Sequence, residues 1–339
     1  MVVFKAKKAA ALAAILLIAL TFLSGCTDSS FGGSSCSVIG NCKTDKKDVE
    51  VPDIIQITSA EVSPAPNGRV SPNSEVNIRV VLKNVNKDPD GSVTVSSFAV
   101  SNAHLLTCVD CTAKFNGKET FEMVPGQERA YIFKLKTPEI DAMAATVTPE
   151  IAVKYDYRST RLVTLTYVKK ETYLDYLNSG KKLTVTISDL ASQGPVELNF
   201  DMTYISDQPL IYEEGGSGEE DSKSSRAVWL SVINKGSGEI SEIAPDNLRV
   251  GFEDNKGKIV DCSETFRDGD IKDWGSWALN KQPIRVLSQN PQRYYFYFEP
   301  TDLDLEDKEF EIVRLFATAD YTYRVKKQVE MTVSKLSPI

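Results

Sequence analysis

The chain has 339 residues, of which 42% are hydrophobic and 25% are charged, and its formal net charge is −8. These values are typical of a globular protein with room for two domains, and the acidic balance argues against a nucleic-acid-binding protein. The single histidine, His104, excludes sites that need two histidines, such as HExxH zinc sites. We therefore expect no metal site, no cofactor and no nucleic-acid partner.

Residues 1–25 are typical of a secretory signal. Three lysines at positions 5, 7 and 8 precede an uncharged apolar run over 9–23, which is short for a bilayer span of about 20 residues. Residues 23–26, Leu-Ser-Gly-Cys, resemble the lipobox of prokaryotic lipoproteins. The resemblance implies cleavage before Cys26 and a lipid on its sulfur, which anchors the protein on the extracellular face of the cell membrane. The alternative is an uncleaved anchor helix.

The segment after the predicted signal has the composition of a stalk. Residues 26–52 are rich in Ser, Gly and Lys and show little hydrophobic periodicity, which predicts a flexible tether behind the lipidated cysteine. Cys36 and Cys42 lie within it, and an exported chain permits a local disulfide between them. We expect the first folded domain to begin at residue 53.

From residue 54 onward, apolar residues recur at every second position, as in the stripe of Ile78, Val80 and Leu82. Such alternation, with frequent turn signals and no long amphipathic helix, predicts an all-β protein of two tandem antiparallel β-sandwiches. We place them at 53–168 and 181–335. Residues 169–180 are the expected linker, with one or two helical turns that end at Gly180.

The two halves also share short sequences. Tyr155-Asp-Tyr-Arg158 and Tyr321-Thr-Tyr-Arg324 are 166 residues apart, and each leads into the last strand of its half. Upstream, the segment that begins at Arg129 matches the one at Arg293, and 80–84 matches 230–234. These ordered matches predict a duplicated domain with one strand order. The aromatic run 294–298 is apolar on both faces, so we expect this strand to be central in its sheet or covered on both sides.

Together these residues resemble the CARDB and related Ig-like modules of exported archaeal and bacterial proteins. The likeness consists of a strand that ends in Lys-Asn or Ile-Asn, a Pro-Gly before an alternating aromatic strand, and a tyrosine-rich closing strand. It implies Ig-like sandwiches used for adhesion, display or spacing on the cell surface. It carries over no catalytic residue.

Cys108-Val-Asp-Cys111 is the sharpest local motif. A thioredoxin-like site needs its first thiol at a helix N-terminus, whereas this pair lies in a β-rich stretch. We therefore expect a small structural disulfide or two thiols without a redox role. With Cys26 lipidated and two close pairs formed, Cys262 is left over, either buried or paired with another chain.

Trp274 and Trp277 are the candidate ligand-binding residues. Both lie in the connection 261–282, which we expect to be a long loop, and exposed aromatic rings stack on sugars or fill pockets in partner proteins. The alternative is that both rings fold back and cover the end of the sandwich. The acidic residues at 268, 270 and 273 lack calcium-loop spacing and predict only an acidic surface.

Three function classes remain. The favoured one is a membrane-anchored binding or adhesion lipoprotein, whose partner is a cell-surface protein or glycan. The second is a structural spacer or an assembly subunit of a surface machine. An extracellular hydrolase is a remote third class, because it needs two acids in one cleft and the chain offers only acids in predicted loops. We therefore expect a protein that is not an enzyme.

Overall fold

The computed structural model describes residues 34–37, 53–65, 69–181, 184–201, 209–212, 226–253, 256–271, 275–288, 290–301, 303–306 and 308–335. The predicted signal, Cys26, Cys42 and Trp274 lie outside these ranges. Within them, no helix is long and apolar enough to cross a bilayer. The described chain consists almost entirely of β-strands in mostly antiparallel sheets, which confirms the predicted all-β fold class.

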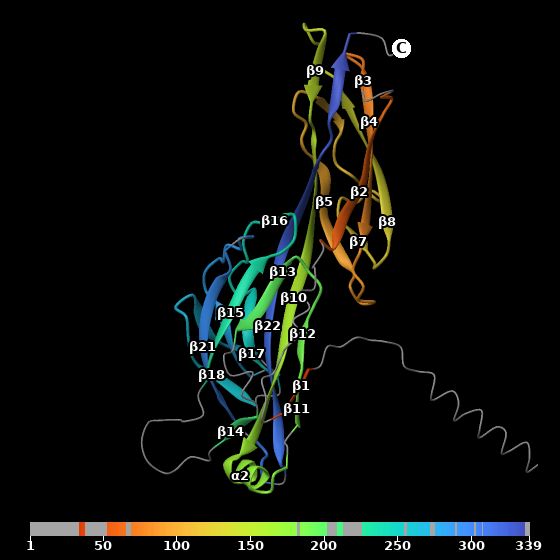
Figure 1. Cartoon of the computed structure of the whole chain (residues 1–339). Helices are drawn as coiled ribbons and strands as arrows, with labels where there is room; N and C mark the ends of the chain where they lie inside the picture. Colours follow the sequence, from red (N-terminus) through yellow and green to blue (C-terminus); the bar gives the residue numbers. More distant parts are fainter. Residues whose placement is uncertain are drawn as a thin grey trace, which may run out of the picture. The chain divides into compact units, whose positions relative to one another are not determined.

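The first half forms two facing sheets (Figure 1). One has the spatial order β2 (Ile55–Ser63), β4 (Glu75–Asn84), β8 (Glu128–Lys136) and β6 (Thr107–Asp110). The facing strands are, in order, β10 (Glu150–Lys169), β5 (Val93–Asn102) and β7 (Phe121–Met123). Every second residue of β4 is buried, so one face of its sheet lines the core. Across that core, the rings of Phe98 on β5 and Phe133 on β8 have centroids 5.0 Å apart.

The second half repeats this arrangement. One sheet has the order β13 (Val196–Asp201), β15 (Arg226–Asn234), β21 (Gln292–Pro300) and β18 (Gly257–Cys262). The facing strands are β22 (Phe310–Gln328), β17 (Leu248–Phe252), β20 (Gly275–Asn280) and β19 (Phe266–Ile271). The rings of Phe252 on β17 and Phe298 on β21 pack across the core at 5.2 Å.

The two halves have the same pairing order. The order β2-β4-β8-β6 corresponds to β13-β15-β21-β18, and β10-β5-β7 corresponds to β22-β17-β20, with β19 added in the second half. The first strand of each half also begins opposite the same residue type, because Ile55 faces Asn84 and Val196 faces Asn234. The predicted repetition of strand order is therefore present.

Asn84 and Asn234 make equivalent hydrogen bonds in the two halves. Both are buried. The side-chain oxygen of each accepts a hydrogen bond from the backbone N–H two residues later, at 2.9 Å from Asn86 and 3.0 Å from Gly236. Each amide also donates to a carbonyl of the following loop, at Gly91 or Gly238. These bonds fix the turn that follows the strand.

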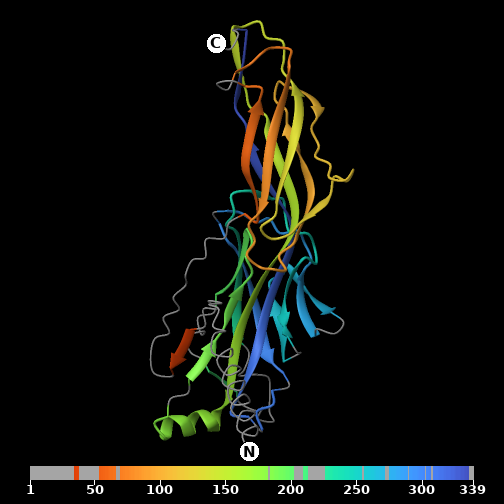
Figure 2. The same cartoon turned by 90° about the vertical axis from the view of Figure 1, so that its right-hand side faces the viewer.

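The connection between the halves differs from our expectation. We expected residues 169–180 to link two separate sandwiches. Instead, β10 and β22 pair antiparallel over 19 positions (Figure 2), so strands of both halves belong to one ten-stranded sheet. Each closing strand extends beyond its own half, and this pairing satisfies backbone groups that would otherwise form an open edge. Residues 170–178 form helix α2 (Lys170–Asn178), which ends before Gly180 at a φ of 62°.

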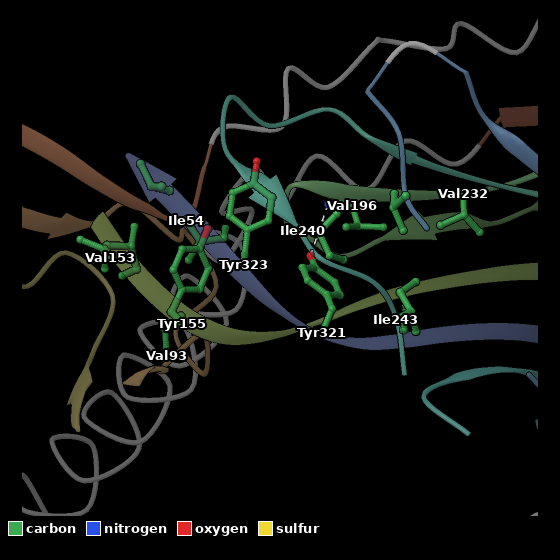
Figure 3. Packing of buried hydrophobic residues seen from close by; sticks show 14 of the residues in the cluster. Ile54, Val93, Val153, Tyr155, Val196, Val232, Ile240, Ile243, Tyr321 and Tyr323 are labelled. Carbon is green, nitrogen blue, oxygen red and sulfur yellow. Dashed lines mark hydrogen bonds between the residues drawn. The ribbon is translucent and has the colours of Figure 1, made fainter. Parts of the chain in front are cut away.

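The repeated tyrosines meet at the centre of this shared sheet. In the β10–β22 ladder, Tyr155 lies opposite Tyr323 and Tyr157 lies opposite Tyr321. The Tyr155 and Tyr323 rings have centroids 5.6 Å apart. Figure 3 shows Tyr155 on β10, and Tyr321 and Tyr323 on β22, among buried side chains of both halves. The tyrosine repeat is therefore the seam between the halves.

Hydrogen bonds from each half to a loop of the other half also hold the two halves together. Ahead of β2, Asp53 accepts hydrogen bonds from the backbone N–H of Ser237, at 3.0 Å, and from its hydroxyl. Ahead of β13, the side-chain oxygen of Gln193 accepts the Lys87 N–H at 3.0 Å. The residues before the first strand of each half thus bind a loop of the other half.

The remaining strands are short. β3 (Arg69–Val70), β23 (Met331–Ser334) and β9 (Ala144–Val147) form a three-stranded sheet, and β1 (Ser34–Ser37) pairs with β11 (Thr184–Ile187). Cys36 belongs to β1, but its side chain lies outside the described part. Three further strands flank the seam, namely β12 (Asp189–Ala191) and β14 (Leu210–Tyr212) on β10, and β16 (Glu239–Ile240) on β22.

The ladders correct one sequence match and add another. Tyr131 lies opposite Val80 and Tyr294 opposite Leu230, so the segment after Arg129 was matched one residue out of register. In addition, Asp110 faces Lys134 and Asp261 faces Tyr297, each after a bulge. Val109-Asp-Cys111 therefore corresponds to Val260-Asp-Cys262.

Candidate functional site

Three aromatic side chains point outward from the second half. On β15, Val228, Leu230 and Val232 are fully buried, so Trp229 projects to the other side of the sheet. On β21, the same alternation buries Tyr294, Phe296 and Phe298 and turns Tyr295 and Tyr297 outward. We name Trp229, Tyr295 and Tyr297 the aromatic face.

The rings of the aromatic face contact one another. Trp229 lies directly opposite Tyr295 in the β15–β21 ladder. Their centroids are 5.8 Å apart, and those of Tyr295 and Tyr297 are 5.9 Å apart, both in an edge-to-face arrangement. Trp229 remains 45% exposed and Tyr297 42% exposed. The three rings thus form one continuous, half-exposed aromatic surface on the two central strands of the sheet.

Charged side chains surround these rings. On the edge strand β13, Asp201 lies opposite Trp229 and is 4.0 Å from Arg293. On the other edge, Asp261 of β18 lies opposite Tyr297. A further pair is Lys258–Glu299 at 3.2 Å. Exposed pairs of this kind contribute little to folding, so their polar atoms can exchange partners at low cost.

The acidic side chains beside the aromatic face affect the pKa of the Tyr295 hydroxyl. The nearby Asp261 carboxylate raises the pKa of Tyr295, with smaller contributions from desolvation and from Cys262, Glu264 and Tyr297. The hydroxyl therefore keeps its proton at neutral pH and can donate a hydrogen bond to a bound molecule.

The predicted binding residue Trp277 does not lie on a free surface. The connection 261–282 contains β19 and β20, which form a hairpin rather than a loop, and β20 pairs with β17. Trp277 is only 5% exposed, and its indole covers Gly251, where an added Cβ would lie 2.5 Å from Cδ2 of the ring. The expectation that Trp277 stacks on a ligand is therefore wrong, and its burial agrees with the packing alternative.

The cysteines and the histidine show no catalytic arrangement among the described residues. Cys108 and Cys111 form a disulfide, which agrees with the structural alternative. His104 has a φ of 53°, and its Nδ1 accepts the Thr148 N–H at 3.3 Å. Cys262 is half-buried at the end of β18, opposite Phe296. In the described ranges, no group of three or more His, Cys, Asp or Glu side chains could hold a metal ion.

Sequence reasoning missed the aromatic face, although a signal was present. Trp229 falls on the polar phase of the stripe formed by Val228, Leu230 and Val232, where a solvent-facing residue is expected. We expected the strand over 294–298 to be central in its sheet or covered on both sides. It is central, between β15 and β18, although Tyr297 on its outer face is exposed. Its central position does not bury both faces, because pairing with strands on both sides leaves the faces of a sheet uncovered.

Comparison with protein-family models and with curated protein sequences finds no match for this chain.

Proposed function

We propose that this chain is an extracellular lipoprotein, held at the membrane by a lipid on Cys26, that binds another component of the cell surface. The lipobox of residues 23–26 and the basic and apolar segment before it support the anchor. In this proposal the protein is a binding or adhesion module of Ig-like type and not an enzyme. The aromatic face provides the binding surface.

The exposure of the aromatic face is the observation that carries this proposal. Large aromatic side chains are costly to leave in water, and contiguous exposed rings mark recognition sites. The equivalent positions of the first half carry Arg79, Ile132 and Lys134, since Arg79 faces Ile132 and Asn77 faces Lys134 in the β4–β8 ladder. The fold itself therefore does not require rings at these positions.

The binding proposal is tested by co-sedimentation of the purified full chain carrying Cys26→Ser, which removes the proposed lipid anchor, with cell envelopes of its own organism. Trp229→Ala combined with Tyr297→Ala should weaken association at least tenfold, since each aromatic anchor is commonly worth more than about 1 kcal/mol. Arg79→Ala combined with Ile132→Ala is the matched control on the first half. Equal binding by the aromatic variant and the wild type would refute the proposal.

The anchor is tested separately. Cys26→Ser should abolish metabolic labelling with a fatty acid or isoprenoid precursor and release the protein from the membrane fraction. Retention of the unlabelled variant in the membrane would favour the uncleaved anchor helix and contradict lipidation.

A spacer or assembly subunit is the second candidate, and the seam between the halves favours it. The β10–β22 ladder and the Asp53 and Gln193 contacts join the halves by backbone pairing rather than by a loose linker. A spacer predicts that deleting the chain impairs the surface structure while the aromatic variant behaves as wild type. The binding proposal predicts that both changes impair it.

A further inference from the structure

We infer that the ligand of the aromatic face is an uncharged glycan, whose sugar rings pack against Trp229, Tyr295 and Tyr297. This inference rests on the proposed binding function and names the chemical class of its ligand. It is carried by the geometry of the rings and by the charges around them.

The shape of the aromatic face suits a chain of sugars. Each sugar ring has an apolar C–H face and a rim of hydroxyl groups, and aromatic rings attract polarised C–H groups to their electron-rich faces. Neighbouring centroids of 5.8 and 5.9 Å are comparable with the length of one sugar unit in a polysaccharide. Because neighbouring rings meet edge to face, the surface offers sugar C–H groups both ring faces and ring edges, while the flanking polar atoms reach the hydroxyl groups.

The charged side chains beside the rings can form hydrogen bonds with sugar hydroxyl groups. Asp201 and Asp261 flank the rings on opposite edge strands, and carboxylates accept hydrogen bonds from hydroxyl donors. Arg293 is 4.0 Å from Asp201 and both side chains are more than half exposed. A sugar hydroxyl can hydrogen-bond to either group in place of this weak contact, because both groups stay accessible to water.

The same charges argue against a protein partner. The centre of a protein interface is depleted of charged residues, because burying them costs desolvation energy. Here charged residues flank the rings on both sides. On β18, Val260 is the large hydrophobic side chain that is exposed. A flat protein surface that covered the rings would also cover Asp201, Asp261 and Arg293. A narrow, hydroxyl-rich chain covers the rings and leaves the charges hydrated or hydrogen-bonded.

The sign of the charge selects among glycans. Asp201, Asp261 and Glu299 outnumber Lys258 and Arg293 beside the rings, and the whole chain is acidic. Anionic polymers such as polyuronates are repelled by these acidic side chains. An uncharged polysaccharide avoids the repulsion and still gains the stacking contacts.

The test uses the purified full chain with defined polysaccharides, namely insoluble β-glucan, mannan and arabinogalactan as uncharged probes and polygalacturonate as the anionic probe. We expect the chain to bind at least one uncharged probe at least tenfold more tightly than the anionic probe. Trp229→Ala should reduce that binding at least tenfold, whereas Ile132→Ala, the matched exposed change on the first half, should not. Trp229→Phe should restore part of it, and unchanged melting temperatures show that each variant is folded.

A second arm separates this inference from the proposed function. Envelopes of the organism are treated with periodate, which destroys sugars with vicinal diols, or with protease. Loss of binding after periodate and not after protease supports the glycan. Loss after protease alone, with binding still dependent on Trp229, overturns the glycan inference and leaves the binding function standing. Preference for polygalacturonate overturns the uncharged class, and binding indifferent to Trp229 overturns the proposed function itself.

Discussion

The outer face of the β4–β8 pair and the outer face of the β15–β21 pair occupy the same place on the same scaffold, yet they carry different chemistry. Arg79, Ile132 and Lys134 occupy the positions of Trp229, Tyr295 and Tyr297. The inward positions of the two pairs remain alike, with Tyr131 and Phe133 corresponding to Tyr294 and Phe296. Inward residues are held by packing density and outward residues are not, so the outward positions are where the halves differ and where recognition is expected.

The largest expected effects test the similarity of the halves. Asn84→Ala and Asn234→Ala should each destabilise the protein by about 1–3 kcal/mol, because each removes the side-chain hydrogen bonds that hold the following turn. Urea unfolding followed by circular dichroism measures both. A large cost for one variant and none for the other would show that the two asparagines do not play equivalent roles.

Alkaline pH tests the seam. Burial raises the pKa of Tyr157 to about 12 and is the main cause of the raised pKa values of Tyr155, Tyr321 and Tyr323. In the unfolded chain tyrosine ionises near pH 10, so above that pH the unfolded state binds fewer protons than the folded state. The contribution of these tyrosines to stability should therefore be constant below about pH 9 and fall progressively from about pH 10 towards pH 12.

Single variants sharpen this pH prediction. Tyr321→Phe should make the loss of stability above pH 10 less steep, because one raised pKa is removed. Tyr295→Phe on the aromatic face should change the slope less, since Tyr295 is not buried. The midpoints of urea unfolding, measured between pH 8 and pH 11, test this prediction. If the midpoint falls with pH equally steeply in both variants, the seam is not the alkaline-sensitive part.

A smaller stability effect is expected when the aromatic face is copied onto the first half. Arg79→Trp, Ile132→Tyr and Lys134→Tyr together should change the free energy of unfolding by no more than about 1 kcal/mol, because these positions are outward-facing. If the aromatic face is sufficient for binding, the variant should bind a soluble oligosaccharide at two sites per chain. Isothermal titration calorimetry gives the stoichiometry, and a value of one would show that the surrounding charges are also required.

The smallest expected effect is the formation of a new disulfide in the second half. Cys262 corresponds to Cys111, while the position of Cys108 is taken by Ile259. Ile259→Cys should therefore form a disulfide with Cys262 under oxidising conditions, as Cys108 and Cys111 do. Mass spectrometry of alkylated peptides tests this, and full alkylation of both thiols in the folded variant would argue against equivalent geometry.

The sequence by itself determined the periodicity and the repetition. Alternating burial on β4 and β15 could be predicted because side chains of a strand point to opposite faces. The repeated asparagines and tyrosines could also be found, and so could the close Cys108–Cys111 pair. The outward direction of Trp229 could be predicted from the alternation along its strand. For the aromatic run 294–298 the sequence did not show which side chains point outward, since both of its faces are apolar.

Only the tertiary structure decided which residues meet. That Tyr155 faces Tyr323 depends on β10 pairing with β22, a contact across more than 150 residues that no local pattern specifies. Likewise, Trp229 and Tyr295 become one surface only through the β15–β21 register, and Trp277 is buried only because β20 places it over Gly251. Local sequence sets the direction in which a side chain points along its strand, whereas long-range pairing sets its neighbours and therefore decides whether an aromatic ring becomes core or binding surface.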